Sequence, residues 1–166
     1  MEFELKSLSA DAIPEALSKA ERYRLLEEPS QAESICLDIL RIEPGNQKAL
    51  VMLLLSLTDQ FGTEATPTRA REVLARIKGD YEQAYYAGII CERSARARMQ
   101  QRLPSGRSRA YADFADAMGW YERAEAFRPP GNDDAILRWN TCARTLMRHK
   151  DLRPEPQERL EAVLDD

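Results

Sequence analysis

The chain has 166 residues, about the size of one domain, and 43% of them are apolar, which is enough for a continuous core. The net charge of −4 is small and argues against wholesale binding to nucleic acid. No apolar run approaches the roughly 20 residues needed to cross a bilayer, and the first residues lack the apolar core of a secretory signal. We therefore expect a cytoplasmic protein without a membrane segment.

Alanine, leucine, glutamate and arginine dominate the chain, and apolar residues recur at three- and four-residue spacing between proline and glycine breaks. Thr66-Pro67 predicts a helix start, because threonine caps a helix and proline suits its first position. Asp80 with Gln83 predicts a capping box at the next start. The eight predicted helices cover about 11–27, 29–43, 46–60, 67–78, 80–103, 107–128, 133–149 and 156–164, with a turn at 104–106.

The predicted helices form antiparallel pairs because short turns join them. Residues 1–10 are expected to be either a short docking segment or a frayed tail, and 11–166 a single all-α domain. The third pair is over-long, and the last serves as a cap. The four pairs cover about 11–43, 46–78, 80–128 and 132–164.

Two segments of the chain, 31–46 and 116–132, match each other. In each, a small residue precedes a larger one by four positions, a packing residue follows three later, and a proline closes the helix five after that. The matched residues are Ala32 and Ala117, Cys36 and Tyr121, Ile39 and Ala124, and Pro44 and Pro129.

Both segments resemble the second helix of a tetratricopeptide repeat. The family's first helix carries a small residue followed three later by a larger one, as Ala20 and Tyr23 do here, and also Gly88 and Cys91. Small residues let paired helices approach closely. The resemblance covers about 11–150 and implies a short right-handed α-solenoid of stacked helix pairs that binds other proteins.

The resemblance is uneven along the chain. The second pair has Leu53-Leu54 where the family has a small residue, and the fourth pair has Trp139. Another α-solenoid or an irregular helical array is therefore the alternative fold.

In such a solenoid the first helix of each pair lines a concave groove. The predicted groove has apolar and aromatic residues in its middle and charged residues at its edges, which suits a peptide with apolar anchors. The alternative is that the chain's own segments fill it. The predicted groove residues are Leu17, Glu21, Arg24, Val51, Leu55, Tyr85, Ile89, Glu92, Ile136, Asn140 and Arg144.

The stretch 93–109 holds six arginines and no acid. Arginine favours carboxylate and phosphate contacts, so an acidic protein or a nucleic acid could dock here, although no aromatic residues interleave for base stacking. The alternative is a solvated hairpin tip. Acids from Asp151 onward could pair with this tip on another copy and give a homodimer. The arginines are Arg93, Arg96, Arg98, Arg102, Arg107 and Arg109.

Nothing in the sequence predicts catalysis, a metal site or a cofactor. The single histidine, His149, ends a helix, where a cation suits the helix dipole. Cys36, Cys91 and Cys142 lie on packing faces and are expected to be structural. The leading hypothesis is an adaptor or scaffold that binds a peptide or protein. The alternative is a nucleic-acid-associated protein that uses the arginine hairpin, and an enzyme on a helical scaffold comes last.

Overall fold

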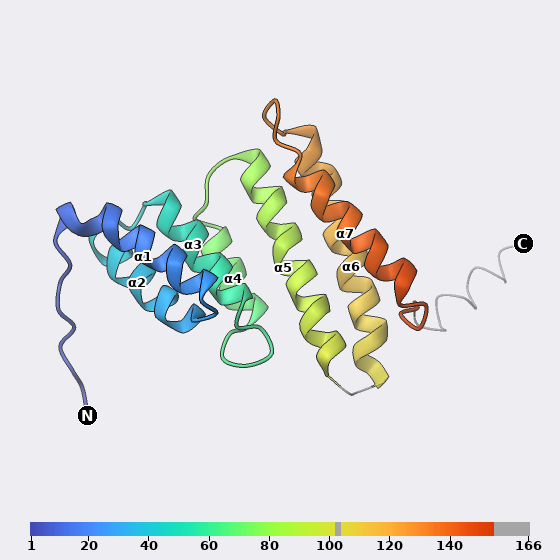
Figure 1. The fold of residues 1–166 in the computed structure, drawn as a ribbon, viewed down its shortest axis with the longest axis horizontal. Coiled ribbons are helices and arrows are strands. Elements are labelled where there is room, and N and C mark those ends of the chain that lie inside the picture. Colours follow the sequence, from blue (N-terminus) through green and yellow to red (C-terminus); the bar gives the residue numbers. More distant parts are fainter. Residues whose placement is uncertain (102–103, 155–166) are drawn as a thin grey trace, which may run out of the picture. The chain divides into compact units, whose positions relative to one another are not determined.

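The computed structural model describes residues 1–101 and 104–154, and this part of the chain is all-α, as predicted (Figure 1). The eighth predicted helix, 156–164, lies outside the described residues. The described elements are η1 (Ala10–Ala12), α1 (Ile13–Leu25), α2 (Pro29–Ile42), α3 (Gln47–Thr58), α4 (Pro67–Leu74), α5 (Asp80–Gln100), α6 (Pro104–Ala126) and α7 (Asp134–Arg148).

The chain divides into two compact units, Met1–Lys78 and Gly79–Asp166. In the first unit α2 packs against α1, α3 packs against α2, and α4 packs against α3. Helix α1 also contacts α3. In the second unit α5 and α6 form a long hairpin, and α7 packs on α6. The single domain over 11–166 stays a prediction. None of the helices in the described part combines the length and hydrophobicity that crossing a membrane requires.

The helix starts of the first unit follow from local side chains. The Asn46 side chain accepts a hydrogen bond from the Ala49 amide at 2.9 Å and so caps α3. Thr66 accepts from the Arg69 amide at 3.4 Å, and Pro67 takes the first helical position, which confirms the predicted start of α4.

Two predicted helix boundaries and one predicted helix cap are wrong, although α5 begins at Asp80 as predicted. Helix α4 ends at Leu74, four residues early, because a tighter turn follows and buries Ile77. Gly79, at φ +104°, is the N-cap of α5 and no side chain caps that helix, so the capping box at Asp80 does not form. Helix α6 begins at Pro104 in place of the predicted turn, since proline lacks only an amide hydrogen that the first turn does not use.

The matching segments of the sequence occupy equivalent buried positions in the two units. Their small, middle and packing residues are all fully buried on α2 and α6, where they face neighbouring helices. This confirms the packing stripe expected from the internal match. The residues are Ala32, Cys36 and Ile39 in the first unit and Ala117, Tyr121 and Ala124 in the second.

Candidate functional site

A buried carboxylate joins the three helices of the second unit. Glu92 of α5 is fully buried, and its Oε1 accepts hydrogen bonds from Arg96 Nη2 at 3.0 Å and Arg138 Nη1 at 3.3 Å. Its Oε2 accepts from the Tyr121 hydroxyl at 2.6 Å. Arg96 comes from the next turn of α5, Tyr121 from α6 and Arg138 from α7. Buried charges are tolerated when they are paired in this way.

A glycine lets the Tyr121 ring reach this carboxylate. A Cβ atom on Gly88, one turn before Glu92, would lie 2.5 Å from Tyr121 Cε1. The ring therefore occupies the space that a larger side chain at position 88 would fill, and its hydroxyl lies beside Glu92. Gly88, the small residue predicted in this helix, thus makes room on α5 for the Tyr121 ring of α6.

The protonation states of the cluster follow from burial and from Glu92. Burial raises the pKa of the Tyr121 hydroxyl, and the Glu92 charge raises it further. Burial also raises the pKa of Tyr85, against the opposing effect of a hydrogen bond from Arg138. For Arg138, burial lowers the pKa, but the Glu92 charge and the two tyrosines outweigh it, and the pKa is raised. At neutral pH both tyrosines keep their protons and Arg138 keeps its charge.

Two cations share the one carboxylate. The side chains of Arg96 and Arg138 are 37% and 34% exposed, while that of Glu92 is fully buried. Arg138 also lies beside Tyr85 at the pocket, and part of its side chain remains open to solvent. A guanidinium carries five N–H donors, more than these contacts use. Arg138 is therefore a partly exposed donor group that a buried carboxylate holds at the surface.

A pocket of about 320 Å³ lies where Arg138 reaches that surface. Tyr85 of α5 forms one side, and four residues of α7 form the rest. Leu137 is 61% exposed and gives the pocket an apolar edge. Hydrogen-bond donors beside an apolar edge suit a peptide, which offers carbonyl oxygens and apolar side chains. The α7 residues are Asp134, Leu137, Arg138 and Thr141.

On α5, only part of the predicted groove is at the surface. Tyr85 lines the pocket beside α7. Ile89 is 1% exposed and Glu92 is fully buried, so the prediction that they line an open groove is wrong. The sequence pattern placed them one turn apart on the face of Tyr85, but α5 is buried more deeply at its centre than a regular first helix would be. Glu92 instead lies behind the pocket and accepts a hydrogen bond from Arg138, which lines it.

On α7 the predicted face is rotated away from the pocket. Ile136 lines a second depression with Glu122, Glu125 and Trp139, on the side of α6. Asn140 is half-buried and Arg144 exposed. The prediction missed Arg138, although its spacing of four from Asp134 and three from Thr141 marks one helical face.

The groove residues predicted in the first unit remain at or near its surface. Leu17, Val51 and Leu55 are half-buried, and Glu21 is exposed. Arg24 makes a two-bond contact with Asp59 of α3's C-terminal end, at 2.7 Å and 3.3 Å, so its charge is already used within the unit.

The arginine-rich stretch is largely engaged within the chain. Besides Arg96 on Glu92, Arg98 binds Asp113 at 2.6 Å, and Arg107 pairs with Asp151. Asp151 was predicted to pair with the arginine stretch of another copy, but in this structure it pairs with Arg107 of its own chain. Arg93 is half-buried and Arg109 exposed, while Arg102 and the chain after 154 lie outside the described residues.

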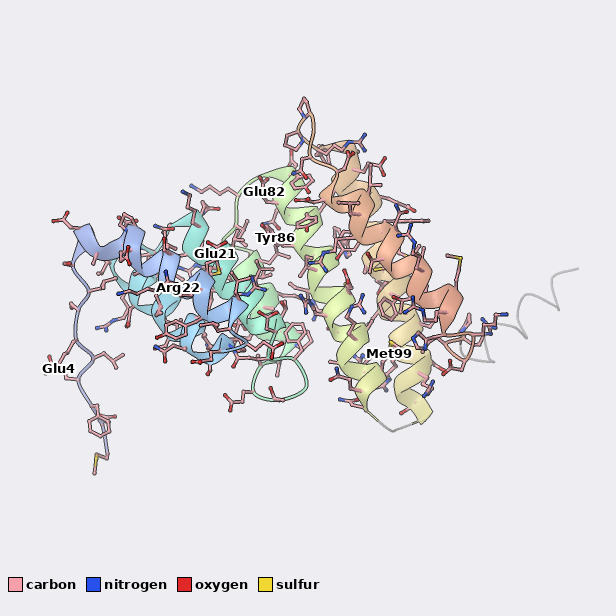
Figure 2. The ribbon with its side chains drawn as sticks, in the orientation of Figure 1. Glu4, Glu21, Arg22, Glu82, Tyr86 and Met99 are labelled. Atoms are coloured by element: carbon pink, nitrogen blue, oxygen red, sulfur yellow. The ribbon has the colours of Figure 1, made fainter. Side chains whose placement is uncertain are left out.

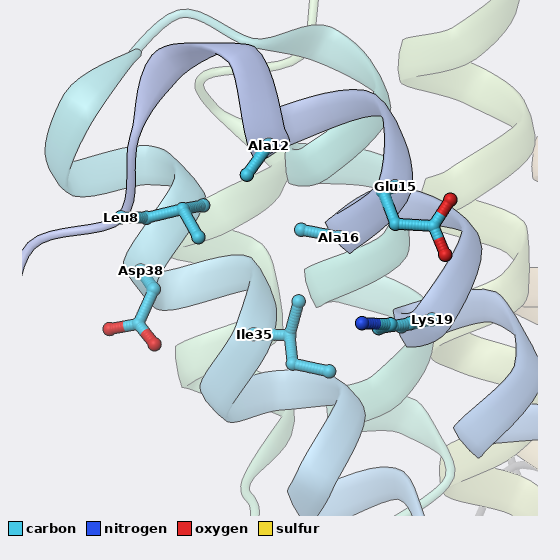
Figure 3. A pocket seen from close by; sticks show the side chains of 7 residues that line it. All are labelled: Leu8, Ala12, Glu15, Ala16, Lys19, Ile35 and Asp38. Atoms are coloured by element: carbon cyan, nitrogen blue, oxygen red, sulfur yellow. The ribbon is translucent and has the colours of Figure 1, made fainter.

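The first unit has a smaller pocket of about 210 Å³ (Figure 3). Leu8 points into it, opposite Ile35 of α2 and Ala16 of α1, with charged residues at the rim. Leu8 itself is half-buried there. Leu8 therefore forms one wall of this pocket, against α1 and α2.

The described part of the chain holds no group of three His, Cys, Asp or Glu residues placed to bind a metal ion. Cys36 and Cys142 are fully buried, and burial raises the pKa of both thiols to about 12. Neither side chain is placed to act as a nucleophile. His149 is half-buried at the end of α7.

No family model matches this chain, and comparison with curated proteins and with solved structures finds no significant similarity.

Proposed function

We propose that the chain is a tetratricopeptide-like protein-binding module of the cytoplasm, and that its second unit binds an extended peptide at the pocket between α5 and α7. The resemblance of 31–46 and 116–132 to the repeat, with matching residues buried in both units, supports the module. Buried thiols at Cys36 and Cys142 suit a reducing compartment.

The observation that carries the proposal is the ion pair between Arg138, at the pocket, and the buried Glu92. Glu92 accepts a hydrogen bond from its guanidinium at 3.3 Å, and Tyr85 lines the pocket beside it. A preorganised donor loses little conformational entropy on binding, so each hydrogen bond to a peptide carbonyl or carboxylate contributes more affinity. Leu137 beside it offers an apolar contact for the peptide's side chains.

The arginine hairpin is a weaker basis for function. Arg96, Arg98 and Arg107 have carboxylate partners in their own chain, and nucleic acid would have to displace these partners. We therefore favour peptide binding over the nucleic-acid alternative.

The test is selection of peptides from a random library displayed on phage, with the full chain immobilised. Selected peptides are then titrated against the chain by calorimetry. We expect Leu137→Ser and Arg138→Gln each to weaken binding about tenfold or more, while Arg109→Gln on the exposed face of α6 leaves it unchanged. Thermal melting confirms that each variant is folded. Peptides that bind all four chains equally would refute the pocket, and a library without binders would refute the function.

A further inference from the structure

A second depression, of about 280 Å³, lies between α6 and α7 of the second unit. The two helices pack side by side (Figures 1 and 2). The residues of α7 that line this depression lie on the opposite side of the helix from Arg138 and Thr141, so it is separate from the pocket at Arg138. We call it the Trp139 pocket, and its lining residues are Glu122, Glu125, Ile136 and Trp139.

The Trp139 pocket has one acidic wall and one apolar wall. Glu122 and Glu125 are three residues apart on α6. Ile136 and Trp139 are three residues apart on α7. Residues at this spacing share one face of a helix, so each helix contributes one wall. An aromatic ring and an aliphatic side chain therefore lie across from two carboxylates.

The indole of Trp139 orients the first of these carboxylates. Its Nε1 donates a hydrogen bond to Glu122 Oε1 at 3.0 Å. An indole N–H is a neutral donor, so the bond positions the carboxylate without cancelling its charge. Within residues 1–101 and 104–154, no lysine, arginine or histidine side chain forms an ion pair with Glu122. Glu122 therefore offers a carboxylate without a counter-charge beside the ring.

The second carboxylate shares its cation with a neighbour. Glu125 Oε1 accepts a hydrogen bond from Arg128 Nη1 at 3.0 Å, and Arg128 Nε also lies 3.6 Å from Asp133 Oδ1. One guanidinium thus serves two carboxylates, while Glu122 has none. The acidic wall of the Trp139 pocket therefore carries an excess of negative charge.

Carboxylates next to an indole ring suit a cation. Tryptophan attracts cations more strongly than the other aromatic side chains, and a guanidinium both stacks on such a ring and donates forked hydrogen bonds to carboxylates. Elsewhere on α6 the chain makes this kind of contact itself, because the Arg123 guanidinium carbon lies 4.8 Å from the centroid of the Trp120 ring. Phosphate or an acidic peptide would meet like charges in the Trp139 pocket.

We propose that the Trp139 pocket binds an arginine side chain of a partner protein. The guanidinium stacks on the indole and donates hydrogen bonds to Glu122 and Glu125. The aliphatic part of the arginine side chain contacts Ile136, as long charged side chains do when they lie along apolar surface. This site goes beyond the proposed function, because it is separate from the pocket at Arg138 and needs no ligand there.

The direct probe is N-acetyl-arginine methylamide, titrated into the isotope-labelled full chain at constant ionic strength. The readout is the NMR signal of the Trp139 indole N–H, which Trp120→Phe assigns because the chain has two tryptophans. We expect this signal to shift and saturate in the millimolar range, since an exposed cation–π contact and surface ion pairs are weak. The matched control ligand, N-acetyl-citrulline methylamide, has nearly the same shape without the charge and should cause no saturable shift.

Removal of charge tests the acidic wall. Glu122→Gln combined with Glu125→Gln keeps the shape of both side chains and should weaken binding about fivefold or more. Glu72→Gln with Asp116→Asn removes two charges outside the pocket and should leave binding unchanged. Arg128→Gln removes the competing guanidinium and should strengthen binding about twofold or more. All of these residues are exposed, so loss of folding does not explain a change.

Three results would overturn the proposal: no saturable shift of the Trp139 signal with the arginine ligand, an equal shift with the citrulline ligand, and binding that survives loss of both carboxylates. Equally tight binding of N-acetyl-lysine methylamide would overturn the assignment to arginine. Library peptides that need Leu137 and Arg138 concern the other pocket. Each pocket can therefore fail its own test without affecting the other.

Discussion

Gly88 of α5 and Tyr121 of α6 occupy one space: a Cβ on Gly88 would lie 2.5 Å from Tyr121 Cε1. Tyr121 cannot withdraw, because it is fully buried and its hydroxyl donates to Glu92 at 2.6 Å. We predict that Gly88→Ala lowers the free energy of unfolding by about 1–3 kcal/mol, since overpacking outweighs the gain in helix propensity. Urea unfolding followed by circular dichroism measures this.

Gly119 of α6 provides the matched control. It also lies within a long helix, but a Cβ there would meet no atom within 4 Å. Gly119→Ala should therefore raise the free energy of unfolding by about 0.5–1 kcal/mol, the usual preference of a helix for alanine. If both substitutions stabilise the chain, the Tyr121 ring is not held where the close approach requires.

Glu92→Gln tests the buried cluster. The substitution keeps the shape of the side chain but leaves Arg96 and Arg138 without a counter-charge. We expect a loss of about 2–3 kcal/mol in the free energy of unfolding, at the lower end for a buried ion pair because both arginines are one-third exposed.

The control for Glu92 is Glu125→Gln. Glu125 pairs with Arg128 at 3.0 Å on the exposed side of α6, and such surface pairs contribute about 0–1 kcal/mol. Equal losses for the two variants would mean that burial of Glu92 adds nothing to its effect.

The fold could be predicted largely because helix periodicity is a local property. The internal match predicts which stripe of each helix packs, and Ala32, Ala117 and Tyr121 on that stripe are fully buried. The end of α4 could not be predicted from periodicity, because a glycine such as Gly79 suits both the end of one helix and the cap of the next.

The candidate site depends on contacts between helices, which no local pattern encodes. Glu92 and Arg138 are 46 residues apart, and their contact requires the angles at which α5 and α7 lie on α6. From sequence alone a glutamate on a helix face is expected at the surface, since buried acids are rare. The one sequence signal for this site is Tyr121 on the buried stripe of α6, because a buried tyrosine hydroxyl needs a hydrogen-bond partner.

Glu27 is a second point at which substitution should stabilise the chain. It follows α1 with φ +60°, and the hydrogen bonds from its amide to the Arg24 carbonyl and from the Glu28 amide to the Tyr23 carbonyl form a Schellman turn. A left-handed backbone costs a non-glycine residue about 1 kcal/mol. Glu27→Gly should therefore raise the free energy of unfolding by up to about 1 kcal/mol, as chemical denaturation would show. Glu28→Gly, next to it, should lower or not change this energy.

Cys36 should make the first unit sensitive to alkali. Burial raises its pKa from 9.0 to about 12 in the folded chain. Below the unfolded pKa both states keep the thiol proton, and the contribution to stability is fully present. Between about 9 and 12 the unfolded chain loses the proton and the folded chain keeps it, so the free energy of unfolding falls by up to about 1.4 kcal/mol per pH unit.

Cys36→Ala isolates this effect because all other titrating groups are common to both chains. At about pH 8 the alanine variant should be less stable by about 1–2 kcal/mol, through the lost packing of a fully buried side chain. By about pH 10.5 this deficit should shrink or reverse, because only the natural chain still carries the penalty of a buried neutral thiol. Urea unfolding across this range measures the difference, and curves that stay parallel would show that Cys36 titrates alike in both states.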